Sequence, residues 1–365
     1  MNVLFLYEHI EGGEKIVTEK IYFELKKRNN SSVTRSLLKP LEKTSSFHYF
    51  SWLFRSLLFA ASEICVKNSL KKISIVYCTT FTAATAALFL RKIYGYKVVF
   101  HYHGSRIPVQ PTSKLSKVSY FTQYLKLQAS LTLHRFVANQ SDVCIAPSTF
   151  SSKELNTILK INRNWISIPN PIAIPIKFIS RTKFTDKKIL LTLGRLDPIK
   201  NYELSIQALH QLQKKYNHFV LIIGYFSPKN LPEHEYLNKL QRLAKKLTIE
   251  KSVVFLENQP SQLLYQLSDI VLAFSHTETF SLIVMEAIAN TKHVLTNTMK
   301  LKEIADQFEN AHFLDTKDPV QLANRIQILA QSEVLSTSSK KMISEYFKIH
   351  KIESVVDSLL QHFSA

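Results

Sequence analysis

Glycine is scarce in this sequence, with six residues in a chain of 365. That is about a quarter of average usage, so glycine-rich repeats and flexible low-complexity linkers are excluded. A glycine that follows a predicted strand therefore needs a specific reason. In doubly wound domains that reason is usually the close approach of backbone to a ligand phosphate.

Cysteine is also rare. Cys65, Cys78 and Cys144 are widely spaced and lie in apolar runs. An odd number without paired spacing excludes a disulfide framework and a cysteine-based metal site. We expect buried thiols in a reducing compartment. The stretch 1–7 has no basic leader and no small-residue cleavage site, so it is expected to be a core strand of a cytoplasmic protein.

Acidic residues are missing from a long part of the chain, since none lies between Glu63 and Asp142. Lysine and arginine total 47 against 28 acids, and residues 1–180 hold 24 of the bases but only nine of the acids. The positive electrostatic potential of such a surface attracts an anionic membrane face, a polyanionic glycan or lipid-diphosphate acceptor, or nucleic acid. A merely soluble basic surface is the alternative. No recognition helix, zinc finger or RNA-binding signature is readable, so nucleic acid is not the expected partner.

Charge is absent from Ile73 to Leu90, about the length of a membrane span. The run divides into a β-branched part and a threonine- and alanine-rich part, which predicts a strand followed by a helix.

Short runs of Val, Ile and Leu alternate with helical patterns, which predicts an α/β protein with parallel sheets. The expected strands are 3–7, 73–78, 97–102, 142–146 and 166–169, then 189–193, 219–223, 252–256, 270–274, 293–296 and 312–314. The proline-rich passage 168–175 separates the two series. We expect one doubly wound domain over 1–175, a second over 176–345, and a C-terminal helix over 346–365 that returns to the first domain.

Two cations follow the first strand of the second series. Gly194 closes that strand, Arg195 and Lys200 follow, and a helical pattern begins at Tyr202. A helix N-terminus flanked by the two-pronged guanidinium of Arg195 and the ammonium of Lys200 is suited to bind a diphosphate. Solvated bases in a turn are the alternative.

Two glutamates with seven residues between them follow the strand 270–274. Glu278 is expected in the loop, and Glu286 about two turns into an otherwise apolar helix. A carboxylate on such a face needs hydrogen bonds, which ribose or sugar hydroxyls can donate, unless it points to water.

The combined pattern resembles the retaining glycosyltransferases of the GT-B class, in which two Rossmann-like domains face a central cleft. Its most specific parts are Gly194-Arg195-Leu196 with Lys200, and Glu278-Thr279-Phe280-Ser281-Leu282 running on to Met285-Glu286-Ala287. The resemblance implies a nucleotide-diphosphate sugar donor, UDP favoured over GDP, with no cofactor and no metal. It also implies that the sugar passes to a glycan or lipid-linked acceptor in cell-envelope polysaccharide or glycolipid synthesis.

The resemblance also assigns roles. Arg195 and Lys200 bind the donor diphosphate, Glu286 accepts from ribose hydroxyls, Glu278 lies near the donor sugar, and Thr279, Phe280 and Ser281 meet the sugar and phosphate. In the first half, Gly12 and Gly13 match a phosphate-side loop, and His103 matches a histidine that faces the reaction centre. Glu278 and His103 are the expected catalytic residues.

Departures from the family pattern keep alternatives open. Thr279 stands where many relatives carry glycine, and Glu11 occupies another glycine position. A nucleotide-sugar epimerase of the same fold, or an inactive relative that serves as a partner subunit, therefore remains an alternative.

An aromatic-rich stretch lies inside the acid-poor region. Residues 47–66 have a helical pattern with many aromatic side chains and basic neighbours. It is either an amphipathic helix in contact with an anionic membrane, at its inner face, or a core helix of the first domain.

Overall fold

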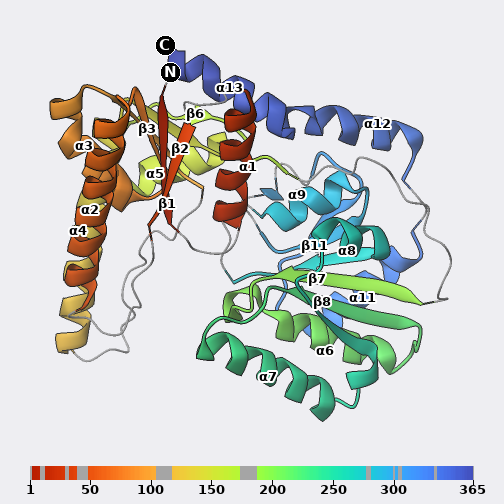
Figure 1. The fold of residues 1–365 in the computed structure, drawn as a ribbon. Helices are drawn as coiled ribbons and strands as arrows, with labels where there is room; N and C mark the ends of the chain where they lie inside the picture. Colours follow the sequence, from red (N-terminus) through yellow and green to blue (C-terminus); the bar gives the residue numbers. More distant parts are fainter. Residues whose placement is uncertain are drawn as a thin grey trace. The chain divides into compact units, whose positions relative to one another are not determined.

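The computed structural model describes residues 2–8, 13–28, 33–38, 48–103, 117–172, 187–276, 281–298, 301–302, 306–332 and 335–364. Contacts divide the chain into two compact units. Unit 1 comprises residues 1–171 and 352–365, and unit 2 comprises residues 172–351. The division after Pro171 falls within the proline-rich passage. Each unit is a layered α/β body with a parallel sheet (Figure 1).

Unit 1 has its strands in the order β2-β1-β3-β4-β5-β6, all parallel. Its elements are β1 (Val3–Glu8), α1 (Gly13–Arg28), β2 (Val33–Leu38), α2 (His48–Leu70), β3 (Ile75–Cys78), α3 (Phe81–Tyr94), β4 (Lys97–His101), α4 (Lys117–Gln140), β5 (Val143–Ala146), α5 (Thr149–Leu159), β6 (Ile166–Ser167) and α13 (Ile352–Ser364). The uncharged run from Ile73 to Leu90 is the strand β3 followed by most of α3, as predicted. Among the described helices, none combines the length and the apolar character needed to cross a membrane.

Alternating side chains on the sheet of unit 1 pack against different helices. Leu4, Val76 and Phe100 belong to a core with residues of α2, α3, α4 and α5. On the opposite face Phe5 contacts Tyr22 of α1, with ring centroids 5.7 Å apart. Tyr77 likewise contacts Phe363 of α13 at 6.2 Å. Both faces of the sheet are therefore covered, which explains the nearly continuous apolar strands.

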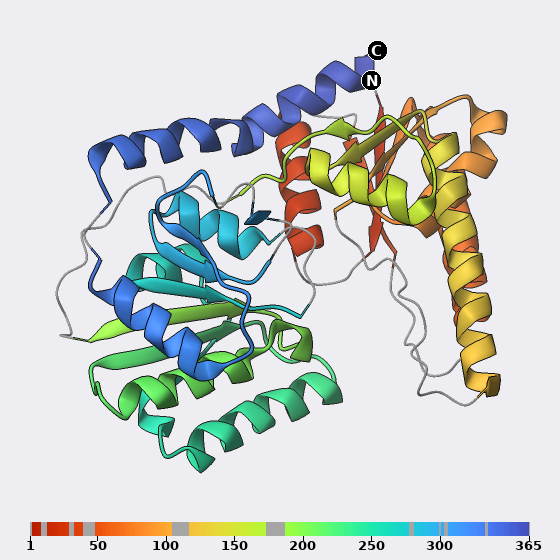
Figure 2. The same cartoon turned by 180° about the vertical axis from the view of Figure 1, so that it is seen from behind.

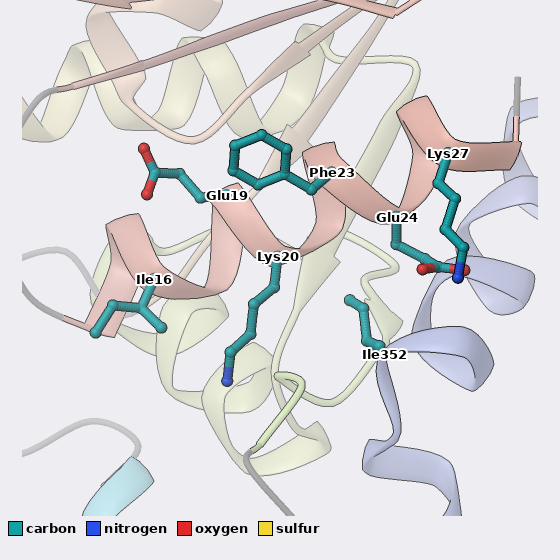
Figure 3. A pocket seen from close by; sticks show the side chains of 7 residues that line it. All are labelled: Ile16, Glu19, Lys20, Phe23, Glu24, Lys27 and Ile352. Atoms are coloured by element: carbon teal, nitrogen blue, oxygen red, sulfur yellow. The ribbon is translucent and has the colours of Figure 1, made fainter. Parts of the chain in front are cut away.

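Helix α13 is attached to α1 by polar contacts as well as packing. Arg28 of α1 pairs with Asp357 and donates to the carbonyl oxygen of Glu353 at 3.2 Å. Figure 3 shows an open hollow beside this contact, lined by side chains of α1 such as Ile16 and Lys20 and by Ile352 at the beginning of α13. The C-terminal segment is therefore part of the α1 side of unit 1.

Unit 2 has the strand order β12-β11-β10-β7-β8-β9, also parallel throughout. Its elements are β7 (Lys188–Gly194), η1 (Pro198–Lys200), α6 (Tyr202–Gln213), β8 (Phe219–Tyr225), α7 (Leu231–Lys246), η2 (Glu250–Ser252), β9 (Val253–Glu257), α8 (Ser261–Leu267), β10 (Ile270–Ala273), α9 (Leu282–Ala289), β11 (His293–Thr296), β12 (Ala311–Phe313), α11 (Pro319–Ala330), α12 (Thr337–Tyr346) and η4 (Phe347–His350). This is the doubly wound nucleotide-binding order, with its reversal between β7 and β10.

Two separate cores cover the sheet of unit 2. Helices α6, α7 and α11 pack on one face through residues such as Leu209, Leu240 and Ile326. Helices α8, α9 and α12 pack on the other face through residues such as Tyr265 and Met285. Figures 1 and 2 show these two helix layers on opposite sides of the strands.

Three expectations need correction. Strand β2 was not predicted, because Arg35 and Ser36 interrupt its apolar pattern. The tail is not one helix from 346 to 365, since Lys351 is extended (φ −65°, ψ 142°) and separates η4 from α13. Cys78 and Cys144 are buried thiols, but Cys65 is only partly buried and accepts a hydrogen bond from the Tyr94 hydroxyl at 3.3 Å.

Buried histidines make the stability of the protein sensitive to acid. Burial lowers the pKa of His103 and of His134 from 6.5 to about 4. Protons therefore bind the unfolded chain first, and stability falls as pH decreases from 6.5 towards 4. For each of these histidines, the free energy of unfolding decreases by on the order of 3 kcal/mol over this pH window. We expect chemical denaturation at a series of pH values to show this loss.

The variant His134→Gln removes one of these groups and should flatten the pH dependence. His234→Gln is the matched control, since His234 is exposed on α7, and it should leave the slope unchanged. Equal slopes in the two variants would contradict the assignment.

Candidate functional site

The carboxyl ends of β7 and β10 lie at the topological reversal of the unit 2 sheet. The two strands pair directly, with Ile270 beside Leu190 and Val271 beside Leu191. In open parallel sheets, ligands bind outside the carboxyl ends of the strands at such a reversal. The turn 195–201 follows β7, and the described residues 274–276 follow β10, so these two segments leave the sheet from neighbouring strand ends.

The loop after β7 is a tightly bonded turn. The Asp197 side chain accepts from the backbone N–H of Ile199 at 3.0 Å, and the Lys200 N–H donates to the Asp197 carbonyl at 2.8 Å. Asn201 has φ 49° in the left-handed region and leads into α6. The turn thus holds Arg195 and Lys200 between the end of a strand and the beginning of a helix.

Gly194 allows other side chains to come close to the end of β7. Its φ of +139° is unfavourable for other residues. A Cβ at this position would lie 3.1 Å from the Tyr202 hydroxyl, 3.6 Å from Cδ1 of Ile283 and 3.8 Å from Cε of Lys200. The structure therefore brings Gly194, Lys200 and the first turn of α9 together, as the sequence suggested for Gly194 and Lys200.

The cation of Arg195 is only weakly paired. Its guanidinium lies 3.9 Å from the Asp197 carboxylate, and 38% of its side chain is exposed. The nearby acid Glu203, in the first turn of α6, is bound by Lys239 at 2.8 Å and by the Tyr236 hydroxyl. Burial opposes ionisation of Glu203, but these hydrogen bonds lower its pKa overall. The Glu203 charge is thus balanced by Lys239 of α7 rather than by Arg195 or Lys200. The turn therefore keeps its net positive charge.

The loop after β10 is tied to the same turn. The backbone N–H of His276 donates to the Ile199 carbonyl at 2.8 Å. The side chain of Asn297, after β11, bonds both the N–H and the carbonyl of Ser275 at 3.1 Å. Ser281 is buried immediately before α9. Glu278, Thr279 and Phe280 lie outside the described residues, so their predicted roles stay predictions.

Glu286 receives a hydrogen bond from a residue that the sequence reasoning missed. The Tyr265 hydroxyl, from α8, donates to Oε2 of Glu286 at 3.1 Å. Tyr265 is fully buried, and burial together with the Glu286 charge raises its pKa well above 10. Glu286 is only partly buried. Its carboxylate is therefore partly shielded from solvent and is hydrogen-bonded within unit 2. The only sequence signal for Tyr265 was a tyrosine in an apolar stretch, whose hydroxyl needs a partner when buried.

His103 lies in unit 1, just after β4, and is buried. Its Nδ1 donates to Oδ1 of Asn170 at 3.0 Å, and its Nε2 has no hydrogen-bond partner among the described residues. The low pKa of about 4, caused by burial, keeps the ring neutral. Nε2 is therefore an unprotonated acceptor.

His101 was assigned to the strand, and the structure places it at the end of β4 beside His103. The two rings have centroids 3.9 Å apart, and Nδ1 of His101 contacts the Tyr77 hydroxyl. Gly13 is the first residue of α1, after the end of β1, while Gly12 lies outside the described residues. Across the described parts of the chain, no three His, Cys, Asp or Glu residues gather in a way that could hold a metal ion.

Both units have the Rossmann-like architecture, and comparison with solved structures identifies the class of fold as GT-B. Sucrose-phosphate synthase from Thermosynechococcus elongatus matches with a TM-score of 0.76 over 100% of this chain and 98% of its own, at 16% identity. HepE from Anabaena, solved with UDP and glucose, matches with a TM-score of 0.74 over 100% and 99%, at 16% identity. The predicted α/β GT-B fold is thereby confirmed.

Family comparisons cover most of the chain. Residues 174–348 match the family described as Glycosyl transferases group 1, and residues 24–174 match Glycosyltransferase Family 4. The chain belongs to the group 1 glycosyltransferase family.

Curated relatives match only part of the chain. N-acetyl-alpha-D-glucosaminyl L-malate synthase from Bacillus anthracis is 25% identical over 62% of this chain and 61% of its own length. D-inositol 3-phosphate glycosyltransferase from Corynebacterium jeikeium is 28% identical over 45% of this chain and 39% of its own. The chain thus spans less than two thirds of the length of these relatives.

Adding a side chain at Gly194 should damage the candidate site. Gly194→Ala introduces a Cβ close to the Tyr202 hydroxyl at a backbone angle that alanine disfavours. We expect a stability loss on the order of 1–3 kcal/mol and weaker nucleotide binding, measured by denaturation and by titration calorimetry with UDP. Gly95→Ala is the control, because Gly95 also has positive φ but has no atom within 4 Å of its added Cβ. Unchanged UDP affinity in Gly194→Ala would contradict the site.

Removing the Tyr265 hydroxyl should weaken the orientation of Glu286. Tyr265→Phe keeps the buried ring but deletes the donor to Oε2 of Glu286. The hypothesis that Glu286 binds the ribose of a UDP donor predicts roughly tenfold weaker UDP binding, because one hydrogen bond to a charged group is lost. Tyr96→Phe is the matched control, since its buried hydroxyl donates to the Ala87 carbonyl in unit 1. An equal effect of both variants on UDP affinity would show that only general stability had changed.

Proposed function

We propose that this protein is a nucleotide-sugar-dependent glycosyltransferase that transfers a sugar with retained anomeric configuration. The proposed donor is a UDP-sugar, and the acceptor is a glycan or lipid-linked molecule of cell-envelope polysaccharide or glycolipid synthesis. The observation that carries the proposal is the joint position of Gly194, Lys200 and α9 at the β7–β10 reversal. Cations and a carboxylate at one sheet edge suit the diphosphate and the ribose of one ligand.

Leaving-group stabilisation is the proposed contribution of Arg195 and Lys200. When the bond between sugar and diphosphate breaks, negative charge accumulates on the departing phosphate. A guanidinium and an ammonium fixed by the turn 194–201 stabilise that charge without prior reorganisation. The weak pairing of Arg195, at 3.9 Å from Asp197, leaves its fork donors suited to phosphate oxygens. This role requires no metal.

Ribose recognition is the proposed role of Glu286. Its partly buried carboxylate already accepts from Tyr265, which fixes one oxygen and leaves further acceptor capacity for vicinal hydroxyls. Ser281, with Thr279 and Phe280, is proposed to contact the sugar and phosphate through the backbone. Glu278 is proposed as the carboxylate nearest the donor sugar, and Gly12 and Gly13 as the phosphate-side loop.

His103 is proposed to accept a hydrogen bond from a hydroxyl of the donor sugar. A neutral imidazole whose Nδ1 proton is held by Asn170 presents a lone pair at Nε2. Because burial lowers its pKa to about 4, the ring is uncharged near neutral pH in the free protein. Its contribution is therefore to orient the sugar at the reacting carbon rather than to neutralise charge.

A similar solved structure supports the proposed donor class, whereas the names of the relatives indicate small acceptors. Both curated relatives carry the names of enzymes that attach a sugar to a small acceptor, and HepE has been solved with UDP. The basic character of residues 1–180 favours an acceptor that carries phosphate or lies at an anionic surface. We therefore place the enzyme in the cytoplasm, in peripheral contact with the inner membrane face.

Thermal stabilisation by nucleotides tests the donor site directly. UDP, GDP, ADP and their glucose conjugates are compared, and a ligand that binds only the folded state must raise its stability. We expect stabilisation by UDP and UDP-sugars that is abolished in Arg195→Ala and in Glu286→Ala. Arg242→Ala and Glu250→Ala are matched controls, being exposed residues of the same unit away from the β7–β10 reversal, and should respond like wild type.

Other outcomes decide between the alternatives. No shift with any nucleotide would overturn the transferase assignment and favour an inactive partner subunit. Turnover of the nucleotide sugar without an acceptor, to an epimeric product, would indicate an epimerase. With an acceptor, NMR of the first-formed product should show the anomeric configuration of the donor, and inversion would overturn the retaining assignment.

A further inference from the structure

Helix α2 exposes an apolar stripe along its outer side. Phe54, Leu58, Val66 and Leu70 are spaced by multiples of four residues and are all more than half exposed, Leu70 to 76%. Ser62 completes the series and is also exposed. The inner side of the same helix is occupied, because its buried residues belong to the core of unit 1. An ordinary surface helix carries polar residues on its outer side.

Helix α4 repeats this arrangement. Its exposed series is Phe121, Leu125, Ala129, Thr132 and Phe136. No charged residue belongs to either series. The opposite side of α4 contributes residues to the same core as α2. Each of these two helices therefore has apolar side chains both on its buried side and on its exposed side.

Helix α3 lies between α2 and α4 and connects the two stripes. Its exposed Phe89 stacks on Phe136 of α4, with ring centroids 5.9 Å apart. Near its end, Ile93 is 71% exposed, and the hydroxyl of the next residue, Tyr94, bonds Cys65 of α2. Figures 1 and 2 both show the three helices side by side on one face of the unit 1 sheet. We call the exposed residues of α2, α3 and α4 the three-helix face.

Basic residues outnumber acids around the three-helix face, where Glu63 of α2 and Asp142 are the acids among the described residues 48–103 and 117–142. Lys71, Lys72 and Lys92 are exposed at the ends of α2 and α3. Asp142, the first acid after Glu63, already pairs with Arg91 at 3.1 Å. An apolar surface with a basic rim is the combination that binds anionic bilayers, where side chains enter the acyl boundary and lysines meet headgroup phosphates. A second copy of the chain fits less well, because an isologous contact would bring two basic rims together.

We propose that the three-helix face is a membrane-binding surface, on which α2, α3 and α4 lie against the anionic headgroups of a bilayer. The inference deepens the proposed function by identifying the surface of unit 1 that meets the membrane, and it rests on that function for its purpose. The binding itself does not depend on the donor site, which lies in unit 2.

Co-sedimentation of the full chain with vesicles tests the surface. Phosphatidylcholine vesicles are compared with phosphatidylcholine vesicles that contain phosphatidylglycerol. The triple variant Phe54→Ser, Leu58→Ser, Leu125→Ser should reduce partition into the anionic vesicles on the order of a hundredfold, since it removes three large apolar side chains. The matched control Leu231→Ser, Val320→Ser, Ile328→Ser removes three exposed apolar side chains from unit 2 and should bind like wild type.

A second pair of variants separates the contribution of charge. Lys71→Gln, Lys72→Gln, Lys92→Gln should weaken binding to the anionic vesicles by roughly a hundredfold, at about 1 kcal/mol per lysine. Lys214→Gln, Lys215→Gln, Lys245→Gln removes three exposed lysines of unit 2 and should have little effect.

Each contrary result has a defined meaning. Vesicle binding that is absent, or that both apolar triples reduce equally, would overturn the inference. A wild-type dimer in solution that dissociates in the Phe54 triple variant, without vesicle binding, would assign the face to a second copy instead. UDP stabilisation is recorded for the same samples. Vesicle binding without stabilisation by UDP would overturn only the proposed function. Stabilisation by UDP without vesicle binding would overturn only the membrane surface.

Discussion

Direct pairing of β7 with β10 is the constraint on which the candidate donor site depends. The two strands are far apart in the sequence, yet their pairing makes the turn 194–201 and the loop before α9 neighbours. The His276 to Ile199 hydrogen bond then ties the second loop to the first. Because Gly194 has no side chain, Lys200 and Ile283 can approach the same strand end. Glu286 lies one turn beyond Ile283 on α9, so the carboxylate and the cations share one edge.

Burial sets the chemical state of the polar groups in both units. Tyr265 is kept protonated by burial and by the Glu286 charge, so its hydroxyl donates to that carboxylate at 3.1 Å, with the Ile283 carbonyl as a second acceptor at 3.4 Å. His103 is kept neutral by burial, and its Nδ1–H donates to the amide oxygen of Asn170. In each case a partner from another element fixes the proton position. The two sites therefore have opposite properties: the turn in unit 2 is positive and partly exposed, whereas the acceptor in unit 1 is neutral and buried.

Features that depend on a local sequence pattern could be predicted, whereas contacts that depend on a partner distant in the sequence could not. Continuous apolar runs predicted the buried strands, but β2 escaped because Arg35 and Ser36 break its pattern. The break at Lys351 has no proline or glycine to mark it. Gly194 and Lys200 could be paired because only seven residues separate strand end and helix start. Tyr265 could not be assigned to Glu286, since their contact depends on how α8 and α9 pack on the sheet.

The aromatic stretch at residues 47–66 shows why periodicity alone left two alternatives open. A core helix and a surface-active helix both need apolar residues at helical spacing, and α2 has buried and exposed apolar sides at once. Helix α3 begins directly after β3, at the sheet edge where the parallel strand β4 also ends and where His103 lies. The exposed Phe121 and Leu125 belong to the first half of α4. A lipid-linked acceptor held at a bilayer would therefore meet unit 1 along a helical surface that includes α3, the helix that begins at the edge of the candidate catalytic residue.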